Sequence, residues 1–347
     1  MQETRTCIQR YFDAGLLENI AIRVGTADKV LFDSYRSKSD PIDDKTLFDM
    51  ASVTKIVVTT TLTLMALDRK LLRLEDPVGK YLPCPPDRAD LTIRHLLTHT
   101  IGFGYRDLRQ AGYTYDNIEA YIFSLPREVP LGSDVRYCCS AFILLGKILE
   151  RVFGKRLNEA FRELVAEPLE MRDTTYLPER NRSFVNSNLS EAEKGIVNCH
   201  NGRFLGGVTG QAGLFSNLSD MTRYAKLLLA HGAPLISREW FDRAIENQTA
   251  GMSEARGLGF VYVDERYPQT GSLFSTGSIG HCGHTGQSLF VDLKSGLYVT
   301  ILSDATISTV RTYGSEHYDE VMQLREELHN AIKADLLSRG QLVQKPE

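Results

Sequence analysis

The chain has 347 residues, of which 42% are hydrophobic and 24% are charged, and these proportions are ordinary for a globular protein. Its formal net charge is -4 at pH 7, its isoelectric point is near 6.1, and Lys and Arg are scattered rather than clustered. This distribution gives no electrostatic footprint for nucleic acid or for an anionic membrane. Small molecules or short peptides are therefore the expected partners.

Three features bear on the compartment. The first 15 residues mix charged with isolated apolar side chains and lack the continuous apolar region of a secretory signal, so export is not predicted. The longest apolar stretch, Ile56–Leu67, is shorter than the roughly 20 residues that cross a bilayer, so no transmembrane helix is predicted. Six cysteines lack C-x-x-C or zinc-ligand spacing, and free thiols in a reducing cytoplasm are the simplest interpretation. They are Cys7, Cys84, Cys138, Cys139, Cys199 and Cys282.

Two antiparallel strands are expected at the start of the fold. Asn19–Val24 and Lys29–Tyr35 are rich in Ile, Val, Leu and Phe, and Gly25–Asp28 between them has the composition of a hairpin turn. The next segment, Ser52–Leu72, carries conflicting signals. Its Val, Ile and Thr residues favour a strand, whereas its length and the spacing of its Leu and Met residues favour a buried helix. We interpret it as a helix.

The middle of the chain is predicted to be mainly helical and its last third to return to antiparallel strands. Apolar residues recur at helical spacing in Ile93–His99, Tyr115–Ser124, Cys139–Phe153, Leu157–Leu164 and Ser219–Leu229. Short strand-like runs follow at Leu258–Val263, Gln287–Leu293 and Gly296–Ser303. The last two runs should form a hairpin. Glu316–Ser338 repeats apolar residues every three or four positions, which predicts a closing amphipathic helix.

Strands at both ends of the chain, with helices between them, indicate one sheet that is split in the sequence. We therefore predict a mixed α/β (α+β) fold that forms a single domain over residues 1–347. Residues 1–75 with 246–347 would form an antiparallel sheet flanked by terminal helices. Residues 76–245 would form a mainly helical lobe packed against it.

The strongest chemical signal is the S-x-x-K element Ser52-Val53-Thr54-Lys55 at the start of the predicted helix. The three-residue spacing puts both functional side chains on one helix face, so that the Lys55 amine can reach the Ser52 hydroxyl. A serine hydroxyl needs an adjacent proton acceptor to act as a nucleophile, and a helix N-terminus favours developing negative charge. Taken alone, this tetrapeptide recurs by chance and usually marks a helix cap or a solvated face.

Several further sequence blocks occur in a fixed order around the S-x-x-K element, and together they are far more specific than the tetrapeptide alone. With their neighbours they resemble the serine β-lactamase and penicillin-binding protein superfamily, and most closely its class C-like hydrolases. The resemblance spans roughly residues 20–305. It implies a β-lactamase/transpeptidase-like fold. The blocks are Phe48–Lys55, Leu74–Pro83, Thr92–Gly102, Tyr137–Gly146, Gly206–Val208, Ala212–Ser216 and Gly283–Gly286.

The resemblance implies roles for individual residues. Ser52 would be acylated, Lys55 would take or relay its proton, and Tyr137 would act as acid and base. Because tyrosine is normally too weak a base at pH 7, this role requires neighbouring cations such as Lys55 that favour its ionised form. The backbone N–H groups of Ser52 and Gln287 would form the oxyanion hole. The segment His284-Thr285-Gly286 would line the substrate cleft, and no cofactor is implied.

Three positions depart from the family pattern. Cys139 stands where the family's Tyr-x-Asn has an asparagine that orients the lysine and the substrate's acylamino group. Cys139 is therefore expected to contact the substrate in place of this asparagine. The loss of the amide predicts weaker recognition of penicillin-like or D-alanyl amides, and a shift toward esters or another amide. Gln211 replaces a common histidine, and His284 replaces a lysine. Neither of these two changes removes the nucleophile.

Other motifs have simpler explanations. His95 and His99 have the i, i+4 spacing of a zinc site but no intervening glutamate, so we expect a structural role, with His99 bonded to the turn before Gly102. His281 and His284 would lie on opposite faces of a strand, which disfavours a shared metal, and no metal site is predicted. Cys138 and Cys139 are more typical of small buried residues than of a thiol nucleophile.

The sequence therefore predicts a serine hydrolase that acts on an ester or amide through an acyl-enzyme on Ser52. A cytosolic esterase or peptidase, possibly acting on peptidoglycan-derived fragments, is the first interpretation, and a true β-lactamase is less favoured. The alternative, motivated by Cys139, is a penicillin-binding or sensor-like protein that keeps the fold without turnover.

Overall fold

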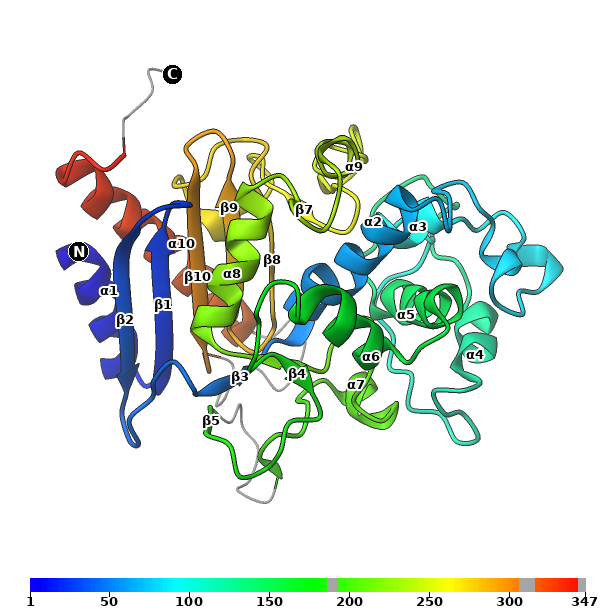
Figure 1. The fold of residues 1–347 in the computed structure, drawn as a ribbon, viewed down its shortest axis with the longest axis horizontal. Helices are drawn as coiled ribbons and strands as arrows, with labels where there is room; N and C mark the ends of the chain where they lie inside the picture. The colour runs from blue at the N-terminus through cyan, green and yellow to red at the C-terminus, as the bar shows by residue number, and fades with distance from the viewer. Residues whose placement is uncertain (186–192, 306–315, 343–347) are drawn as a thin grey trace.

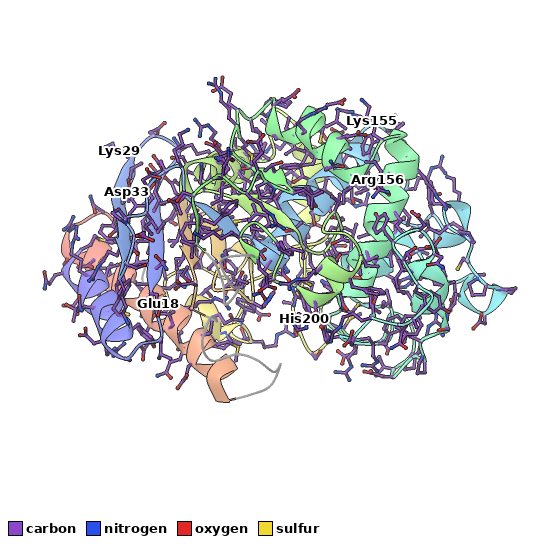
Figure 2. The ribbon with its side chains drawn as sticks, turned by 90° about the horizontal axis from the view of Figure 1, so that it is seen from below. Glu18, Lys29, Asp33, Lys155, Arg156 and His200 are labelled. Atoms are coloured by element: carbon purple, nitrogen blue, oxygen red, sulfur yellow. The ribbon has the colours of Figure 1, made fainter. Side chains whose placement is uncertain are left out.

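The computed structural model describes residues 1–185, 193–305 and 316–342. Two units are visible in Figure 1, with a twisted sheet and its helices on one side and a mainly helical lobe on the other. Exposed charged side chains such as Lys29, Asp33, Lys155 and Arg156 cover the outside of both units (Figure 2).

The main sheet joins the two ends of the sequence, as predicted. Its six strands are ordered β2-β1-β10-β9-β8-β7, and every neighbouring pair is antiparallel. Ile20 of β1 pairs with Ser303 of β10, so the first and last of the described strands lie side by side. The strands are β1 (Asn19–Gly25), β2 (Val30–Ser37), β7 (Val261–Tyr262), β8 (Ile279–Cys282), β9 (Ser288–Asp292) and β10 (Leu297–Ser303).

Helices cover both faces of this sheet because its central strands are apolar on both sides. Ile20 and Ile22 of β1 join one hydrophobic cluster with the helices α1 (Gln2–Asp13) and α10 (Glu316–Ser338), whereas Ala21 between them joins the cluster on the other face. The other face is covered by α8 (Leu218–Leu229), whose N-cap Asn217 accepts a hydrogen bond from the Asp220 N–H. The two-residue alternation of a strand explains the division.

The conflicting segment after Ser52 is helical, as predicted. It runs as a 3₁₀ turn (Ala51–Val53), a π-helical stretch (Lys55–Thr60) and then α2 (Thr61–Asp68). Residues 51–68 are long and apolar enough to span a membrane by length and composition alone, but 89% of this stretch is buried inside the protein. Burial on all sides is the pattern of a core helix, and tertiary contacts override the strand preference of its β-branched residues.

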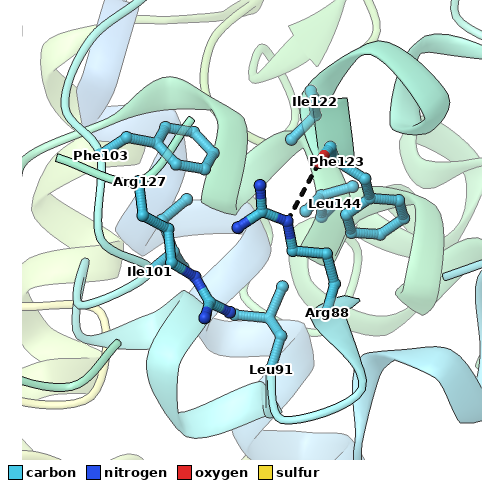
Figure 3. Close-up of a pocket in the computed structure, with 8 residues that line it drawn as sticks. All are labelled: Arg88, Leu91, Ile101, Phe103, Ile122, Phe123, Arg127 and Leu144. Atoms are coloured by element: carbon cyan, nitrogen blue, oxygen red, sulfur yellow. Dashed lines mark hydrogen bonds between the residues drawn. The ribbon is translucent and has the colours of Figure 1, made fainter. Parts of the chain in front are cut away.

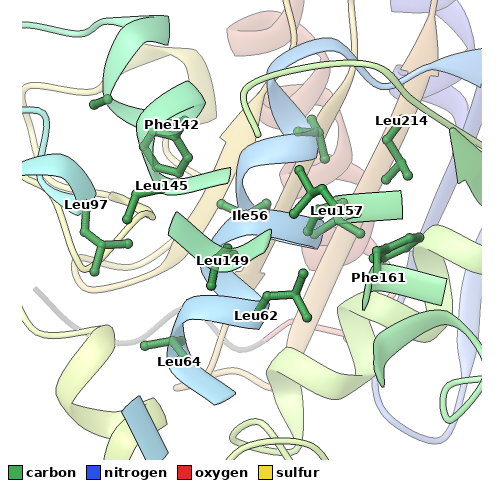
Figure 4. Close-up of a cluster of buried hydrophobic side chains, with 14 of the residues drawn as sticks. Ile56, Leu62, Leu64, Leu97, Phe142, Leu145, Leu149, Leu157, Phe161 and Leu214 are labelled. Atoms are coloured by element: carbon green, nitrogen blue, oxygen red, sulfur yellow. The ribbon is translucent and has the colours of Figure 1, made fainter. Parts of the chain in front are cut away.

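The helical lobe is organised around α5 (Cys139–Phe153). Figure 4 shows Phe142, Leu145 and Leu149 of this helix packed toward Ile56 and Leu62. The shorter helices are α3 (Ile93–Leu97), α4 (Ile118–Ser124), α6 (Leu157–Phe161), α7 (His200–Phe204) and α9 (Arg238–Ala244).

A second, small sheet was not predicted. Its strands, in the order β4-β6-β3-β5, are β4 (Thr175–Tyr176), β6 (Leu214–Ser216), β3 (Leu47–Asp49) and β5 (Phe184–Val185). Strands of two or three residues are too short to show a period in the sequence. Their functional importance is that β3 ends three residues before Ser52.

Candidate active site

Ser52 lies at a sharp turn between the small sheet and the core helix. Asp49 ends β3 and accepts a hydrogen bond from the Ala51 N–H at 2.8 Å. Ala51 takes the unusual φ of 44°, a left-handed conformation that a non-glycine residue adopts only when its surroundings enforce it. Asp49 is buried, and this burial raises its pKa to about 6. The turn presents Ser52 half-buried rather than enclosed.

Lys55 follows one helical turn later and is completely buried. Its Nζ lies 2.9 Å from Ser52 Oγ and donates to the Gln211 carbonyl oxygen at 3.1 Å. Burial lowers the pKa of Lys55, because the ammonium form loses hydration inside the protein. The neutral amine, which can accept the proton of Ser52, is therefore favoured relative to a lysine in water.

Tyr137 reaches the same serine from the segment before α5. Its Oη donates to Ser52 Oγ at 2.7 Å, and Lys55 Nζ lies 5.0 Å from the centre of its ring. The structure thus brings together Ser52, Lys55 and Tyr137, the three residues to which the sequence assigned the chemistry. Tyr137 is 85 residues from Ser52, so the helical lobe is what closes this arrangement.

His99 holds Tyr137 in place from both sides. Its carbonyl oxygen accepts from the Arg136 N–H at 2.8 Å, and its Nδ1 accepts from the Cys138 N–H at 3.3 Å. The centroids of the His99 imidazole ring and the Tyr137 phenol ring are 4.7 Å apart. His99 was expected to bond the turn before Gly102, and the bonds to the Tyr137 segment are a different structural role.

The predicted cleft segment His284-Thr285-Gly286 lies in the turn between β8 and β9. Thr285 Oγ1 donates to the Asp49 carbonyl oxygen at 3.0 Å, and His284 Nε2 lies 2.9 Å from Asn198 Oδ1. Since β8 ends at Cys282, the expectation that His284 and His281 occupy opposite faces of one strand is wrong. His281 belongs to β8 and pairs with Leu289 of β9, whereas His284 lies in the turn between these two strands.

A second H-x-G segment, His281-Cys282-Gly283, touches the turn that presents Ser52. A methyl group added at Gly283 would come within 2.9 Å of the Met50 carbonyl oxygen and 3.1 Å of Ala51 Cβ. The same methyl would lie 3.4 Å from Gln287 Cβ, so Gly283 separates the nucleophile turn from Gln287. The His281 ring is 6.1 Å from the Tyr137 ring. The oxyanion role of Gln287 and the cleft roles of His284, Thr285 and Gly286 stay predictions.

Cys139, in place of the family asparagine, is the first residue of α5 and is buried. Burial raises the pKa of Cys138 to about 12, and it has the same effect on Cys199, which follows Asn198. These two thiols are therefore held in the protonated, weakly nucleophilic form. Gln211 is also buried, and its amide nitrogen and oxygen find no partner within the described part of the chain.

Two hollows in the surface lie away from this site. One has a volume of about 10 Å³, roughly the minimum for a single water, and lies between apolar side chains and the guanidinium groups of Arg88 and Arg127 (Figure 3). The other, of about 530 Å³, is lined by residues of α6, the segment after it and β4. Ser52, Lys55 and Tyr137 line neither of them.

The sequence of this chain is similar to those of known proteins of one family. The family profile described as Beta-lactamase matches residues 5–321. Esterase EstB of Burkholderia gladioli is 31% identical to this chain, over 78% of the chain and 80% of its own length. The D-alanyl-D-alanine-carboxypeptidase/endopeptidase AmpH of Escherichia coli (strain K12) is 27% identical, over 67% of this chain and 64% of its own length.

Solved structures give the same fold. The octameric penicillin-binding protein homologue from Pyrococcus abyssi superposes with a TM-score of 0.74 at 18% identity, covering 98% of this chain and 77% of that chain. The predicted fold class, an antiparallel sheet with helices in a β-lactamase/transpeptidase-like arrangement, is confirmed.

Proposed function

The chain belongs to the β-lactamase family of serine hydrolases, and on that basis we propose that it hydrolyses an ester or amide through an acyl-enzyme on Ser52. One observation carries the proposal. The Ser52 hydroxyl oxygen lies 2.9 Å from a buried lysine amine and 2.7 Å from a tyrosine hydroxyl. This is the geometry of a serine nucleophile with an adjacent base.

The proposed reaction has two steps. Ser52 Oγ attacks the substrate carbonyl while its proton passes to the neutral Lys55 amine or, when the phenol is ionised, to Tyr137 Oη. The same pair returns the proton to the leaving group, so an acyl ester of Ser52 forms. Water then attacks this ester with Tyr137 and Lys55 acting as base, and Ser52 is released. The backbone N–H groups of Ser52 and of Gln287, just before β9, would stabilise the oxyanion.

We favour small esters as the first substrate class. Cys139 provides a thiol where an amide would orient the acylamino group of a peptide-like substrate. A relative named as an esterase matches most of the chain. D-amino-acid peptides, including wall-derived fragments, are the second class, because other relatives are named as D-alanyl-D-alanine carboxypeptidases.

All six cysteines are free, which supports a cytoplasmic location as part of this proposal.

Cys139 also motivates the second candidate, a binding or sensor-like protein that acylates without releasing product. The two candidates differ in the fate of the acyl group. Steady product formation supports the hydrolase, whereas a stable adduct without turnover supports the binding protein.

Intact-mass spectrometry after treatment with a fluorophosphonate, together with p-nitrophenyl butyrate turnover, tests the proposal. We expect one adduct and steady turnover in the wild-type protein, and neither in Ser52→Ala. Ser124→Ala, at an exposed serine at the end of α4, is the matched control and should behave as wild type. Full turnover by Ser52→Ala would refute the assignment of the nucleophile.

A further inference from the structure

Arg256, which lies in the loop before β7, packs against Tyr137. The carbon at the centre of its guanidinium is 5.6 Å from the centre of the Tyr137 ring, and the residue is only 5% exposed. No motif marks this arginine in the sequence. Lys55 Nζ also lies over the Tyr137 ring, so Arg256 is a second buried basic side chain beside the phenol.

The loop that carries Arg256 is fixed to the segment that carries Tyr137. The Ser253 N–H donates to Asp134 Oδ1 at 2.8 Å, and Ser253 Oγ donates to the Val135 carbonyl oxygen at 3.4 Å. The Arg256 N–H donates to Thr249 Oγ1 at 2.9 Å. Because the bonds of Ser253 end two and three residues before Tyr137, they connect the loop that carries the guanidinium directly to the segment that carries the phenol.

The charge of Arg256 is only partly neutralised. Its Nε donates to Glu254 Oε2 at 3.1 Å, and its Nη2 bonds the same oxygen. The side chain of Glu254 is 44% exposed, so water screens this carboxylate. Arg256 Nη1 is buried and meets no acceptor in the described part of the chain. Most buried donors are paired, so the unpaired Nη1 leaves part of the guanidinium charge without a neighbouring acceptor.

In the described part of the chain, two histidines also face the Tyr137 ring, and both are neutral. Burial lowers the pKa of His99 well below its usual value, and Arg256 and Lys55 lower it further. Burial, followed by Lys55 and Arg256, has the same effect on the pKa of His281. Among the described residues placed against Tyr137, Arg256 from the loop before β7 is therefore the group that keeps its positive charge whether or not Lys55 holds its proton. In low-dielectric surroundings such charges act strongly over 5–6 Å.

We propose that Arg256 is a positioning residue for the Ser52 reaction, whose guanidinium, acting through Tyr137, stabilises the ionised phenol and sets the pH range in which the site works. This inference rests on the proposed function of Ser52. It names a second cation, outside the S-x-x-K element, that makes an ordinary tyrosine usable as a base. A positive charge at 4–6 Å typically lowers the pKa of an acidic group by one to three units.

The test is the pH dependence of kcat/KM for p-nitrophenyl butyrate. In Arg256→Met we expect the ascending limb of the profile to move to higher pH by about one unit or more, with roughly tenfold lower kcat/KM at pH 7. Arg256→Lys, which keeps the charge, should restore the limb to within about half a unit of its wild-type position. Arg256→Gln provides a polar variant without charge if the methionine variant fails to fold, and its limb should also move.

Arg23→Met is the matched control, because Arg23 is likewise buried and paired to a half-exposed carboxylate, Asp33, but belongs to β1. Its limb should stay in place. Loss of activity in the Arg256 variants with an unmoved limb would overturn the inference and indicate a purely structural arginine. Fluorophosphonate labelling of Ser52 separates the two proposals. If Ser52 of the wild-type protein is labelled and the protein turns over substrate, but the ascending limb of the Arg256→Met pH profile does not move, the hydrolase proposal is retained. The proposed role of Arg256 is then refuted.

Discussion

Replacing Lys55 by methionine separates the catalytic role of this residue from its structural cost. Methionine has a similar length and no charge, so it fills the same fully buried volume. Burial lowers the pKa of Lys55, which means that the buried ammonium form lowers the free energy of unfolding. We therefore expect Lys55→Met to be inactive yet at least as stable as the wild-type protein.

The magnitude follows from the contacts. Removing a buried charge recovers several kcal/mol of desolvation. The Gln211 carbonyl oxygen loses its 3.1 Å partner, which costs about 1–3 kcal/mol. The net expectation is a stabilisation of about 1–3 kcal/mol, or roughly 1–4 °C in Tm for a chain of this size. The kcat/KM for p-nitrophenyl butyrate should fall by at least about 10²-fold, as for loss of a general base.

The gain should depend on pH with a definite sign. A lysine whose pKa is lower in the folded state binds fewer protons when folded, so its contribution to the free energy of unfolding rises with pH from the lowered pKa up to about 10.5. The stability advantage of Lys55→Met over the wild-type protein should consequently be largest at low pH and shrink as the pH rises from the lowered pKa toward about 10.5. Urea titrations followed by fluorescence at pH 6 and pH 9 measure this difference.

Lys147→Met is the matched control, because Lys147 is the partner of a buried carboxylate. Its Nζ lies 2.9 Å from Glu119 Oε2, and both side chains are 7% exposed. Breaking such a pair leaves Glu119 unpaired and should destabilise the protein by about 3–5 kcal/mol. A Lys55→Met protein that is less stable than wild type by more than about 1 kcal/mol at pH 7, or that keeps activity within tenfold, would refute the reasoning.

Three further predictions follow from local geometry. Tyr137→Phe removes the hydroxyl 2.7 Å from Ser52 Oγ and should lower kcat/KM by about 10²–10⁴-fold with Tm nearly unchanged; a decrease of less than threefold would contradict its catalytic role. Gly283→Ala places a methyl group 2.9 Å from the Met50 carbonyl oxygen, so displacement of the nucleophile turn should slow fluorophosphonate labelling of Ser52, and unchanged labelling would show that the turn does not depend on this contact. Asn217→Ala removes the N-cap of α8 and should cost about 1 kcal/mol in urea unfolding without changing kcat/KM, whereas Asn217→Ser should recover most of the loss.

Local patterns predicted the long elements of the fold. The bounds of α5 and α10 agree with the sequence-based segments, because an apolar stripe at helical spacing is complete within each helix. The hairpins β1–β2 and β9–β10 were predicted for a similar reason, since a turn signal lies between two apolar runs. The small sheet around β3 was missed, because its pairing joins segments far apart in the sequence.

The candidate active site likewise combines local geometry that the sequence predicts with long-range contacts that it does not. The sequence alone determined that Ser52 and Lys55 meet, because three residues along a helix bring two side chains to one face. The family resemblance named Tyr137, and the tertiary structure brings its hydroxyl to Ser52 from the helical lobe. Only the tertiary structure showed that Gly283, rather than Gly286, packs against the nucleophile turn. No sequence motif marks Arg256. Its effect depends on its burial and on the 5.6 Å distance between its guanidinium carbon and the centre of the Tyr137 ring. Spacing along the chain records short-range geometry, whereas the electrostatic surroundings of a site depend on contacts that exist only once the two units have packed together.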